Sequence, residues 1–475
     1  EPTGHIVATF PITAEGASYT SRNAFNLLAS DDEWSSPIVA EVGPDGNVWI
    51  VDWYNFIVQH NPTPSGFKTG KGNAYETELR DKKHGRIYRL VYKSKAGNGS
   101  LNLSKADNKT LVQTLKNDNL FWRRHAQRLL VERKATDIAS DLLDLAKDKT
   151  LDDAGLAPGT MHALWTLKAL GELENENAAA FPLAVQALKH PAAGVRLNAV
   201  KVLPQSMKSV EAILAAKMLE DSEPQVRLAA TLALADQPAH KASATAITTM
   251  LKTPKYPSDR WMLDALVCAA ANNDKLFIKE ATTDAKGSNP DQLMVLEKVA
   301  EHFARGNPKD EIHEVLQALV HSNTLAQTAV LRGLARGWPA NNPLELTEKT
   351  ETILAELFNK ASTGAKGQLA LLGKKWKSKA LQAKSMEVVQ SFIKLASDSK
   401  QNETERIQAA RQACEFGSGD ASVSIAILDL INPQLTPEVG NAFIEATGLS
   451  ERPETAKHLV EKLSTWPPSL RQTAI

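Results

Sequence analysis

Four side chains in the first hundred residues have the types that polar-ligand binding and proton transfer require. They are a carboxylate, a phenol, an imidazole and a guanidinium, at Asp52, Tyr54, His60 and Arg86. A carboxylate or an imidazole can serve as a general base when a substrate proton lies within hydrogen-bond reach. These four residues therefore form the candidate site. Their catalytic and cofactor-binding roles stay open, and we expect no metal ion there.

Three of these residues also have a structural interpretation. Asp52 can accept backbone N–H bonds and hold the turn after its strand, a role that we favour over catalysis or metal binding. His60 precedes NPTP and can cap a turn, and Arg86 can face solvent from a strand. The segment TGKGNAY lacks the spacing of a phosphate-binding P-loop, and the sequence contains no H-E-x-x-H.

The residues around the candidate site predict a small sheet. The turn GPDG at 43–46 separates PIVAEV from NVWIVDW, and GRIYRLVYK follows after the long segment 56–85. A segment of that length without apolar periodicity is either functional or disordered. Such a turn followed by a strand and Asp is typical of a β-propeller blade, and a single blade leaves its edges unpaired. We therefore expect residues 1–95 to be the C-terminal blade of a truncated propeller, with its sister blades upstream.

Beyond a polar hinge at 96–106, the sequence changes to Ala, Leu, Lys and Glu in helical periods. An Arg followed three residues later by an Ala recurs inside apolar stripes, with weaker copies between. The marker positions are Ala126, Ala163, Ala199, Ala230, Leu263 to Ala265, Leu296, Ala329, Ala370, Ala409, Ala442 and Ala474. Steps of about 31 to about 41 residues suit a two-helix unit. The fold class predicted is mostly α, a HEAT-repeat α-solenoid over 107–475 with about 10 to 11 helix pairs.

Several recurring residues are expected to be structural. The arginines of the repeat should each reach a carboxylate or a carbonyl of the preceding repeat: Arg123, Arg196, Arg227 and Arg406. Most of the recurring tryptophans should lie in the core, whereas a contiguous aromatic lining of the concave face would favour a binding scaffold: Trp122, Trp165, Trp261, Trp338 and Trp376. Cys268 and Cys414 should be small buried side chains without a disulfide between them.

Composition excludes some classes of function. The 55 basic and 55 acidic residues balance, which argues against a nucleic-acid partner. No apolar run approaches the roughly 20 residues of a membrane span. The chain begins without an initiator Met or a signal peptide and stops inside a helical pattern, so we expect a fragment of a longer polypeptide, truncated at the C-terminus.

The run NLLASDDEWSSPIVAEVGPDGNVWIVDWYNFIVQHN, then HGRIYRL, then HEAT-type repeats, resembles one large bacterial family. It is the membrane-bound dehydrogenase family of planctomycetes, verrucomicrobia and bacteroidetes, also described as PVC-type haem-binding proteins. The resemblance implies a propeller similar to quinoprotein glucose/sorbosone dehydrogenases, with the quinone cofactor PQQ. It also implies a C-terminal cytochrome c domain with haem c, and a periplasmic or cell-surface location. This chain has no C-x-x-C-H and only part of a propeller, so we expect it to hold neither cofactor.

Two hypotheses follow. In the first, the chain is a fragment of an extracytoplasmic redox protein that oxidises a sugar or alcohol, and the solenoid is a scaffold between the propeller and the cytochrome-like domain. Its partners are then the upstream blades and that downstream domain, and this chain alone is inactive. In the second, the chain is a non-catalytic scaffold whose solenoid binds a protein or a carbohydrate.

Overall fold

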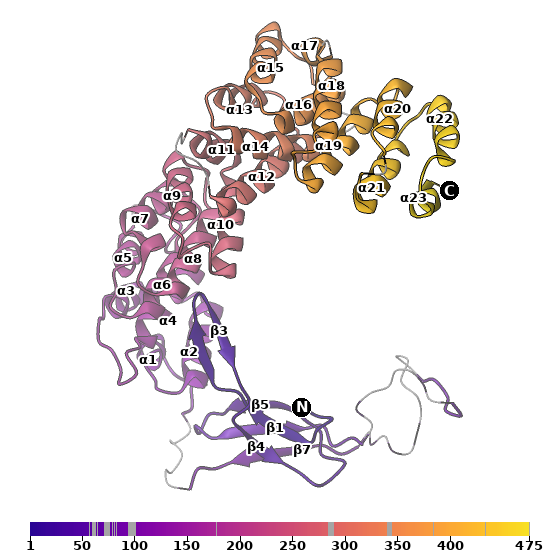
Figure 1. The fold of residues 1–475 in the computed structure, drawn as a ribbon. Coiled ribbons are helices and arrows are strands. Elements are labelled where there is room, and N and C mark those ends of the chain that lie inside the picture. The colour runs from indigo at the N-terminus through magenta and orange to yellow at the C-terminus, as the bar shows by residue number, and fades with distance from the viewer. Residues whose placement is uncertain are drawn as a thin grey trace. The chain divides into compact units, whose positions relative to one another are not determined.

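The computed structural model describes residues 1–475 except 57, 59–62, 64, 71–76, 78, 80, 82, 94–100, 177, 284–288, 340–343, 383, 433 and 475. The chain is mostly helical, with stacked helices that follow a small β segment, as the sequence predicts (Figure 1). It divides into two compact units, residues 1–233 and 234–475, and the division falls within one helix.

Seven strands among the described residues form what we call the β module: β1 (Ile6–Thr9), β2 (Ile12–Glu15), β3 (Ser18–Ser21), β4 (Phe25–Ala29), β5 (Pro37–Val42), β6 (Val48–Asp52) and β7 (Arg86–Leu90). Strands β5, β6 and β7 form an antiparallel sheet in that order, at the places that the sequence predicts. Strand β1 pairs with β4 and β2 with β3. These four short strands were not anticipated.

The turn between β5 and β6 is held by its own side chains. Gly46 has a left-handed φ of 78°, which glycine adopts without a steric penalty. The carboxylate of Asp45 accepts hydrogen bonds from the Asn47 backbone N–H and the Trp49 indole, at 3.1 and 2.9 Å. A Cβ on Gly43 would lie 2.2 Å from the Trp49 ring, so the ring packs directly on the glycine. The GPDG motif is therefore required by local geometry.

The helices of the first unit form two layers (Figure 1). Helices α2, α4 and α6 pack on one another in one layer, and α1, α3, α5 and α7 make up the other. Their bounds are α1 (Asn108–Thr114), α2 (Leu120–Glu132), α3 (Ala139–Ala146), α4 (Pro158–Ala169), α5 (Ala180–Ala187), α6 (Ala193–Val202), α7 (Met207–Ala215) and α8 (Pro224–Asp236), with short 3₁₀ turns at Thr136–Ile138 and Met218–Glu220.

The helices of the second unit also form two layers. Helices α10, α12, α14 and α16 follow one another in one layer, and α9, α11, α13 and α15 in the other. The bounds are α9 (Lys241–Lys252), α10 (Arg260–Asn272), α11 (Asp274–Thr282), α12 (Pro290–Arg305), α13 (Ile312–Leu319), α14 (Thr324–Gly337), α15 (Glu348–Lys360), α16 (Thr363–Trp376), α17 (Lys379–Gln382), α18 (Ser385–Ser397), α19 (Glu403–Phe416), α20 (Ala421–Asp429), α21 (Pro437–Thr447), α22 (Pro453–Leu463) and α23 (Pro468–Ala474).

The residues that mark the sequence repeat lie, within each unit, on helices of one layer. Each marker falls in a different helix among α2, α4, α6, α8, α10, α12, α14, α16, α19, α21 and α23. Most of them are buried, among them Ala126, Ala163, Ala199 and Ala230. Side chains about one repeat apart touch, as in the pair Arg332 and Glu297, which are 35 residues apart. A buried side chain as small as Ala lets neighbouring helices approach closely.

The arginines of the repeat are structural, as predicted, but their partners differ from the prediction. Arg123 donates to the main-chain oxygens of Asn117 and Asp118, which lie just before its own helix. Arg227 does the same to Asp221 and Ser222. The remaining two contacts are Arg196 with Asp221 and with the carbonyls of His190 and Pro191, and Arg406 with the carbonyl of Ala396. These arginines fix the turn that leads into each helix.

The recurring tryptophans do not line one continuous surface. Trp338 and Trp376 are fully buried and pack edge to face at 5.1 Å, and Trp122 is also buried. Trp165 is half-buried, and Trp261 is exposed. Both cysteines are free, and the expectation that both are buried was wrong for Cys268, which is exposed.

Candidate functional site

Three of the four candidate residues lie together at one end of the β5–β6–β7 sheet. Asp52 ends β6 and pairs in register with Arg86, the first residue of β7. Tyr54 follows two residues after Asp52 with a left-handed φ of 53°, which is uncommon for a residue with a side chain. The fourth candidate, His60, lies outside the described residues.

The Asp52 carboxylate is buried and surrounded by donors. Its Oδ1 accepts the backbone N–H groups of Ser36 and Tyr54, at 2.6 and 2.9 Å. Its Oδ2 accepts the hydroxyls of Ser35 and Tyr88, at 3.3 and 3.1 Å. Those bonds tie the loop before β5 and the residues after β6 to a single side chain. They also hold Tyr54 in its left-handed conformation.

Arg86 links the same carboxylate to a second one. Its Nε lies 3.2 Å from Asp52 Oδ2, and its Nη2 donates to Asp32 Oδ2 at 2.8 Å. Its guanidinium also lies 3.8 Å from the centre of the Tyr54 ring, which is a cation–π contact. The pKa of Asp32 is lowered by the hydrogen bond from Arg86 and by the backbone N–H of Trp34. Asp32 therefore stays ionised as a partner of the guanidinium.

These contacts determine what the cluster can do. A buried carboxylate that accepts four hydrogen bonds and faces a guanidinium has no lone pair left for a substrate proton. The guanidinium is shared by two carboxylates, so it is not available to an anionic ligand. The geometry thus assigns Asp52, Arg86 and Tyr54 to holding the loops at the end of the sheet, the structural role that the sequence favoured for Asp52.

Two members of the cluster were missed at the sequence level. Tyr88 lies two residues after Arg86, and the period of two along a strand puts both on one face, so the pattern itself indicated it. Burial and the hydrogen bond to Asp52 raise the pKa of Tyr88, so its phenol stays a donor. Asp32 is 54 residues from Arg86 and lies in a loop, where no periodic signal exists.

A second feature of the β module is its attachment to the first helices. Asn119 caps the N-terminus of α2 through its side-chain oxygen, which accepts the Phe121 N–H at 2.9 Å, and its Nδ2 donates to the carbonyl of Gly43 at 2.8 Å. The indole of Trp122 donates to the carbonyl of Pro44 at 2.8 Å. The turn of the sheet is thus bound directly to α2.

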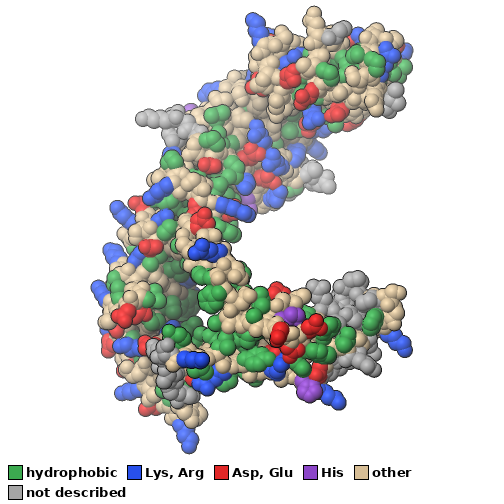
Figure 2. Space-filling view, turned by 60° about the horizontal axis from the view of Figure 1, so that its bottom comes forward, with side chains coloured by type: hydrophobic (Ala, Val, Ile, Leu, Met, Phe, Trp, Pro, Cys, Tyr) green, Lys and Arg blue, Asp and Glu red, His purple; other side chains and the backbone are tan. Residues whose placement is uncertain are grey.

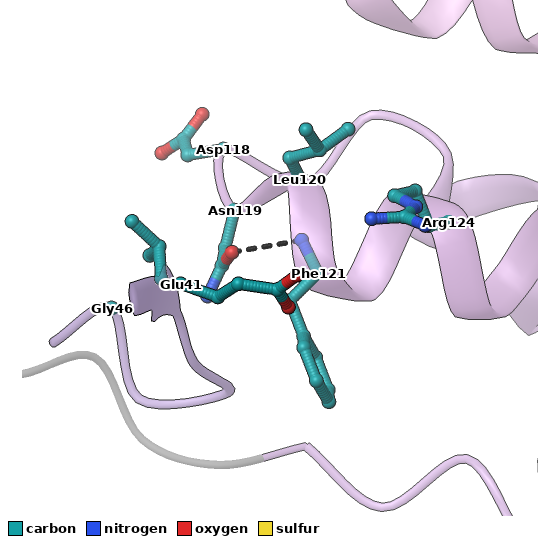
Figure 3. Close-up of a pocket in the computed structure, with 8 residues that line it drawn as sticks. Glu41, Gly46, Asp118, Asn119, Leu120, Phe121 and Arg124 are labelled. Carbon is teal, nitrogen blue, oxygen red and sulfur yellow. Dashed lines mark hydrogen bonds between the residues drawn. The ribbon is translucent and has the colours of Figure 1, made fainter. Parts of the chain in front are cut away.

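An open hollow of about 560 Å³ lies beside this attachment. Glu41 from β5 and Arg124 from α2 extend into it, with Phe121 between them (Figure 3). The volume falls within the range of small-molecule sites.

The β2–β3 hairpin makes a further contact along the first unit. Ala17 at its tip is buried, and Gln225 of α8 donates to the carbonyl of Ser18 at 3.1 Å. Among the described residues, no group of three or more His, Cys, Asp or Glu side chains is arranged to hold a metal ion. None of the described helices is both long and apolar enough to cross a membrane.

Comparison with known proteins finds a match for the N-terminal part of the chain. Residues 1–94 match the family model described as a domain of unknown function, DUF7133. No curated protein matches the chain. The match covers all seven strands of the β module.

Proposed function

We propose that this chain is a scaffold, in which the helical array carries a propeller-type sheet whose uncovered face packs against another blade. The observation that carries the proposal is a row of apolar side chains across the three strands. Val39, Val51 and Ile87 are directly opposite one another in register and are 45%, 39% and 68% exposed. Hydrophobic side chains are visible on the surface of the β module in Figure 2.

The two faces of the sheet differ in what covers them. Ile50 and Asp52 point to the opposite face from Val51 and are buried. A sheet stabilises itself by burying an apolar face against another layer, and contiguous exposed apolar residues mark an interaction surface. A neighbouring blade is the occupant that a propeller would supply. This is the support for the expected partnership with further blades.

The wider setting that we propose is an extracytoplasmic redox protein of the quinoprotein sugar-dehydrogenase type. The support for this setting is the resemblance of the strand and turn motifs to those of that dehydrogenase family. The matched family model, DUF7133, has no assigned function and therefore gives no further support. In this setting the blades and a cytochrome-like domain supply the chemistry, and this chain supplies the mechanical connection.

The residues present do not fit either of the implied cofactors. Covalent haem c needs two cysteines and a histidine in C-x-x-C-H, whereas Cys268 and Cys414 lie on α10 and α19. PQQ carries carboxylates that need cations, and Arg86 is already shared by Asp32 and Asp52. We therefore derive no catalytic step within this chain.

The alternative is a scaffold that binds a protein or a glycan without any redox partner. The Asp52 cluster is compatible with the redox setting and with this alternative, because its polar groups are already paired with one another. An absorbance spectrum and a dye-linked sugar oxidation assay on the intact parent protein distinguish the two hypotheses. The redox setting predicts haem or quinone absorbance and turnover with a sugar, and the alternative predicts neither.

A further inference from the structure

The second unit contains a groove between two neighbouring helices of one layer, α12 and α14. It has a volume of about 670 Å³ and an apolar floor made by Leu293, Met294, Leu325 and Ala329. Leu325 is exposed, so the floor is open to solvent. The lining positions on α14 run from Thr324 to Arg336, twelve residues along one helical stripe or roughly 18 Å.

Two glycines set the spacing of the two helices beside the groove. A Cβ on Gly333 would lie 2.3 Å from the carbonyl oxygen of Glu297, and one on Gly337 would lie 2.3 Å from that of Glu301. The backbones of α12 and α14 therefore touch at this end. Because the contact requires glycine at both positions, the relative placement of the helices, and with it the groove, is fixed.

On this face of α12 and α14, the carboxylates are mostly buried and the guanidinium groups are exposed. Glu297 and Glu301 are only 18% and 15% exposed, whereas Arg332 and Arg336 are 49% and 57% exposed. Arg332 lies 3.1 Å from Glu297, and Arg336 lies 3.0 Å from Glu297 and 3.4 Å from Glu301. The carboxylates thus hold the guanidinium groups in place at the rim, and the rim itself is positive.

Two more cations belong to the same surface. Lys298 is exposed on α12 and lines the groove. Arg305, also on α12, pairs with Glu301 and is largely exposed. This surface therefore carries four cations and two carboxylates, which makes it locally positive in a chain whose net charge is zero. The cations are Lys298, Arg305, Arg332 and Arg336.

We propose that this groove binds a polypeptide segment that carries apolar and acidic side chains on one face. Apolar side chains would displace water from the floor, which is the main source of affinity for such a groove. Carboxylates of the segment would pair with Lys298 and with Arg332 and Arg336, which Glu297 and Glu301 orient. Unlike Arg86, which is shared with a fully buried carboxylate, Arg332 and Arg336 have about half of their side chains exposed to a ligand. A stripe of about 18 Å matches roughly three turns of a bound helix. This proposal does not depend on the proposed function of the β module.

A synthetic peptide tests the proposal with the full chain. The probe is a fluorescein-labelled 14-residue helix with leucines on one stripe and glutamates on either side of it, and binding is followed by fluorescence anisotropy. A second peptide has lysine at every glutamate position, and a single-stranded oligonucleotide serves as a polyanion. We expect saturable binding of the acidic peptide, at least about tenfold tighter than that of either comparison ligand.

Three variants locate the binding. Lys298→Glu leaves the Arg–Glu pairs intact, so it tests the charge of the rim without disturbing the fold, and Leu325→Ser tests the floor. Each should weaken binding of the acidic peptide by about fivefold or more. Arg260→Glu is the matched control, because Arg260 is an exposed arginine of α10 in the same unit, and it should change nothing.

The same experiment can overturn the proposal. Equal binding of the acidic and the lysine peptide would show attraction to the apolar floor alone, and preferential binding of the oligonucleotide would show a polyanion site. Absence of binding, or affinities that Lys298→Glu and Leu325→Ser leave unchanged, would also refute it. Circular dichroism and melting temperature confirm that each variant is folded.

Discussion

The indole nitrogen of Trp122 in α2 donates a hydrogen bond to the main-chain oxygen of Pro44, 78 residues earlier in the chain, at 2.8 Å. Together with the bond from Asn119 to Gly43, it joins the turn of the β5–β6–β7 sheet to the first helix pair. The sheet is therefore anchored by its turn, and one of its faces stays open.

Trp122→Phe should loosen this anchor. The substitution keeps an aromatic ring in the buried site but removes the indole N–H that donates to Pro44, so we expect a loss of about 1 kcal/mol in the free energy of unfolding. Amide hydrogen exchange of residues 43–49 should become faster. Trp165→Phe removes an indole bond to Asn198 instead and should leave that exchange unchanged. Equal effects of the two variants would show that the indole bond is not the anchor.

Asp52→Asn should destabilise the β module. The amide keeps the shape of the carboxylate, but it removes the charge that faces Arg86 and replaces one acceptor with a donor, which costs roughly 2 to 3 kcal/mol. Urea unfolding of the chain measures the effect, with the exposed Asp31→Asn as control. A catalytic role of Asp52 would instead abolish sugar oxidation by the intact protein while stability stayed the same.

Gly333→Ala and Gly364→Ala should have opposite effects. At Gly333 the added Cβ would collide with a carbonyl oxygen of α12, and the helices cannot separate without losing packing, so we expect a loss of about 2 kcal/mol or more. Gly364 lies in α16 with nothing within 4 Å of its Cβ position, and alanine there should stabilise by roughly 0.5 to 1 kcal/mol. Thermal melts of both variants provide the comparison. A neutral Gly333→Ala would contradict backbone contact between α12 and α14.

Acid should weaken the first unit through His162. Burial, aided by the charge of Arg123, lowers the pKa of this imidazole from 6.5 to about 4. Between those values the unfolded chain binds a proton that the folded chain does not, so stability is lost as the pH falls from 6.5 to 4 and not further below. The loss is about 3 kcal/mol at 1.36 kcal/mol per pKa unit.

His162→Gln should remove this part of the pH dependence. Urea midpoints measured at several pH values between 7 and 4 should fall less steeply for the variant than for the unchanged chain. His321→Gln, at an exposed position, is the control and should retain the original slope. The assignment fails if both variants behave alike.

The sequence predicted the fold where periodicity was strong. The Arg and Ala spacing located the helices because each stacked pair must bury the same small residue. The β-branched and aromatic residues of NVWIVDW and the strand-like run GRIYRL located β6 and β7, whose pairing in the structure places Asp52 opposite Arg86. Strands β1 to β4 were missed because they are only four or five residues long and largely exposed, without an apolar period.

Long-range contacts explain the rest of what sequence reasoning could not find. Asp32 reaches Arg86, and Gln225 reaches the hairpin at Ser18, across 54 and 207 residues. Neither residue lies in a periodic pattern that would indicate its distant partner. The sequence indicated Asp52, Tyr54 and Arg86 as a group. Their structural role became clear only from the hydrogen-bond donors that surround the Asp52 carboxylate.

The most direct test of the scaffold account is the accessibility of Ile87, which lies on the open sheet face. Ile87→Cys is compared with the natural exposed Cys268 by maleimide labelling and peptide mass spectrometry, in this chain alone and in the intact parent protein. The account predicts that both cysteines react at similar rates in the chain alone, and that position 87 becomes at least about tenfold slower in the intact protein while Cys268 does not change. Equal reactivity of position 87 in the two proteins would contradict the account, because no blade would then cover the face.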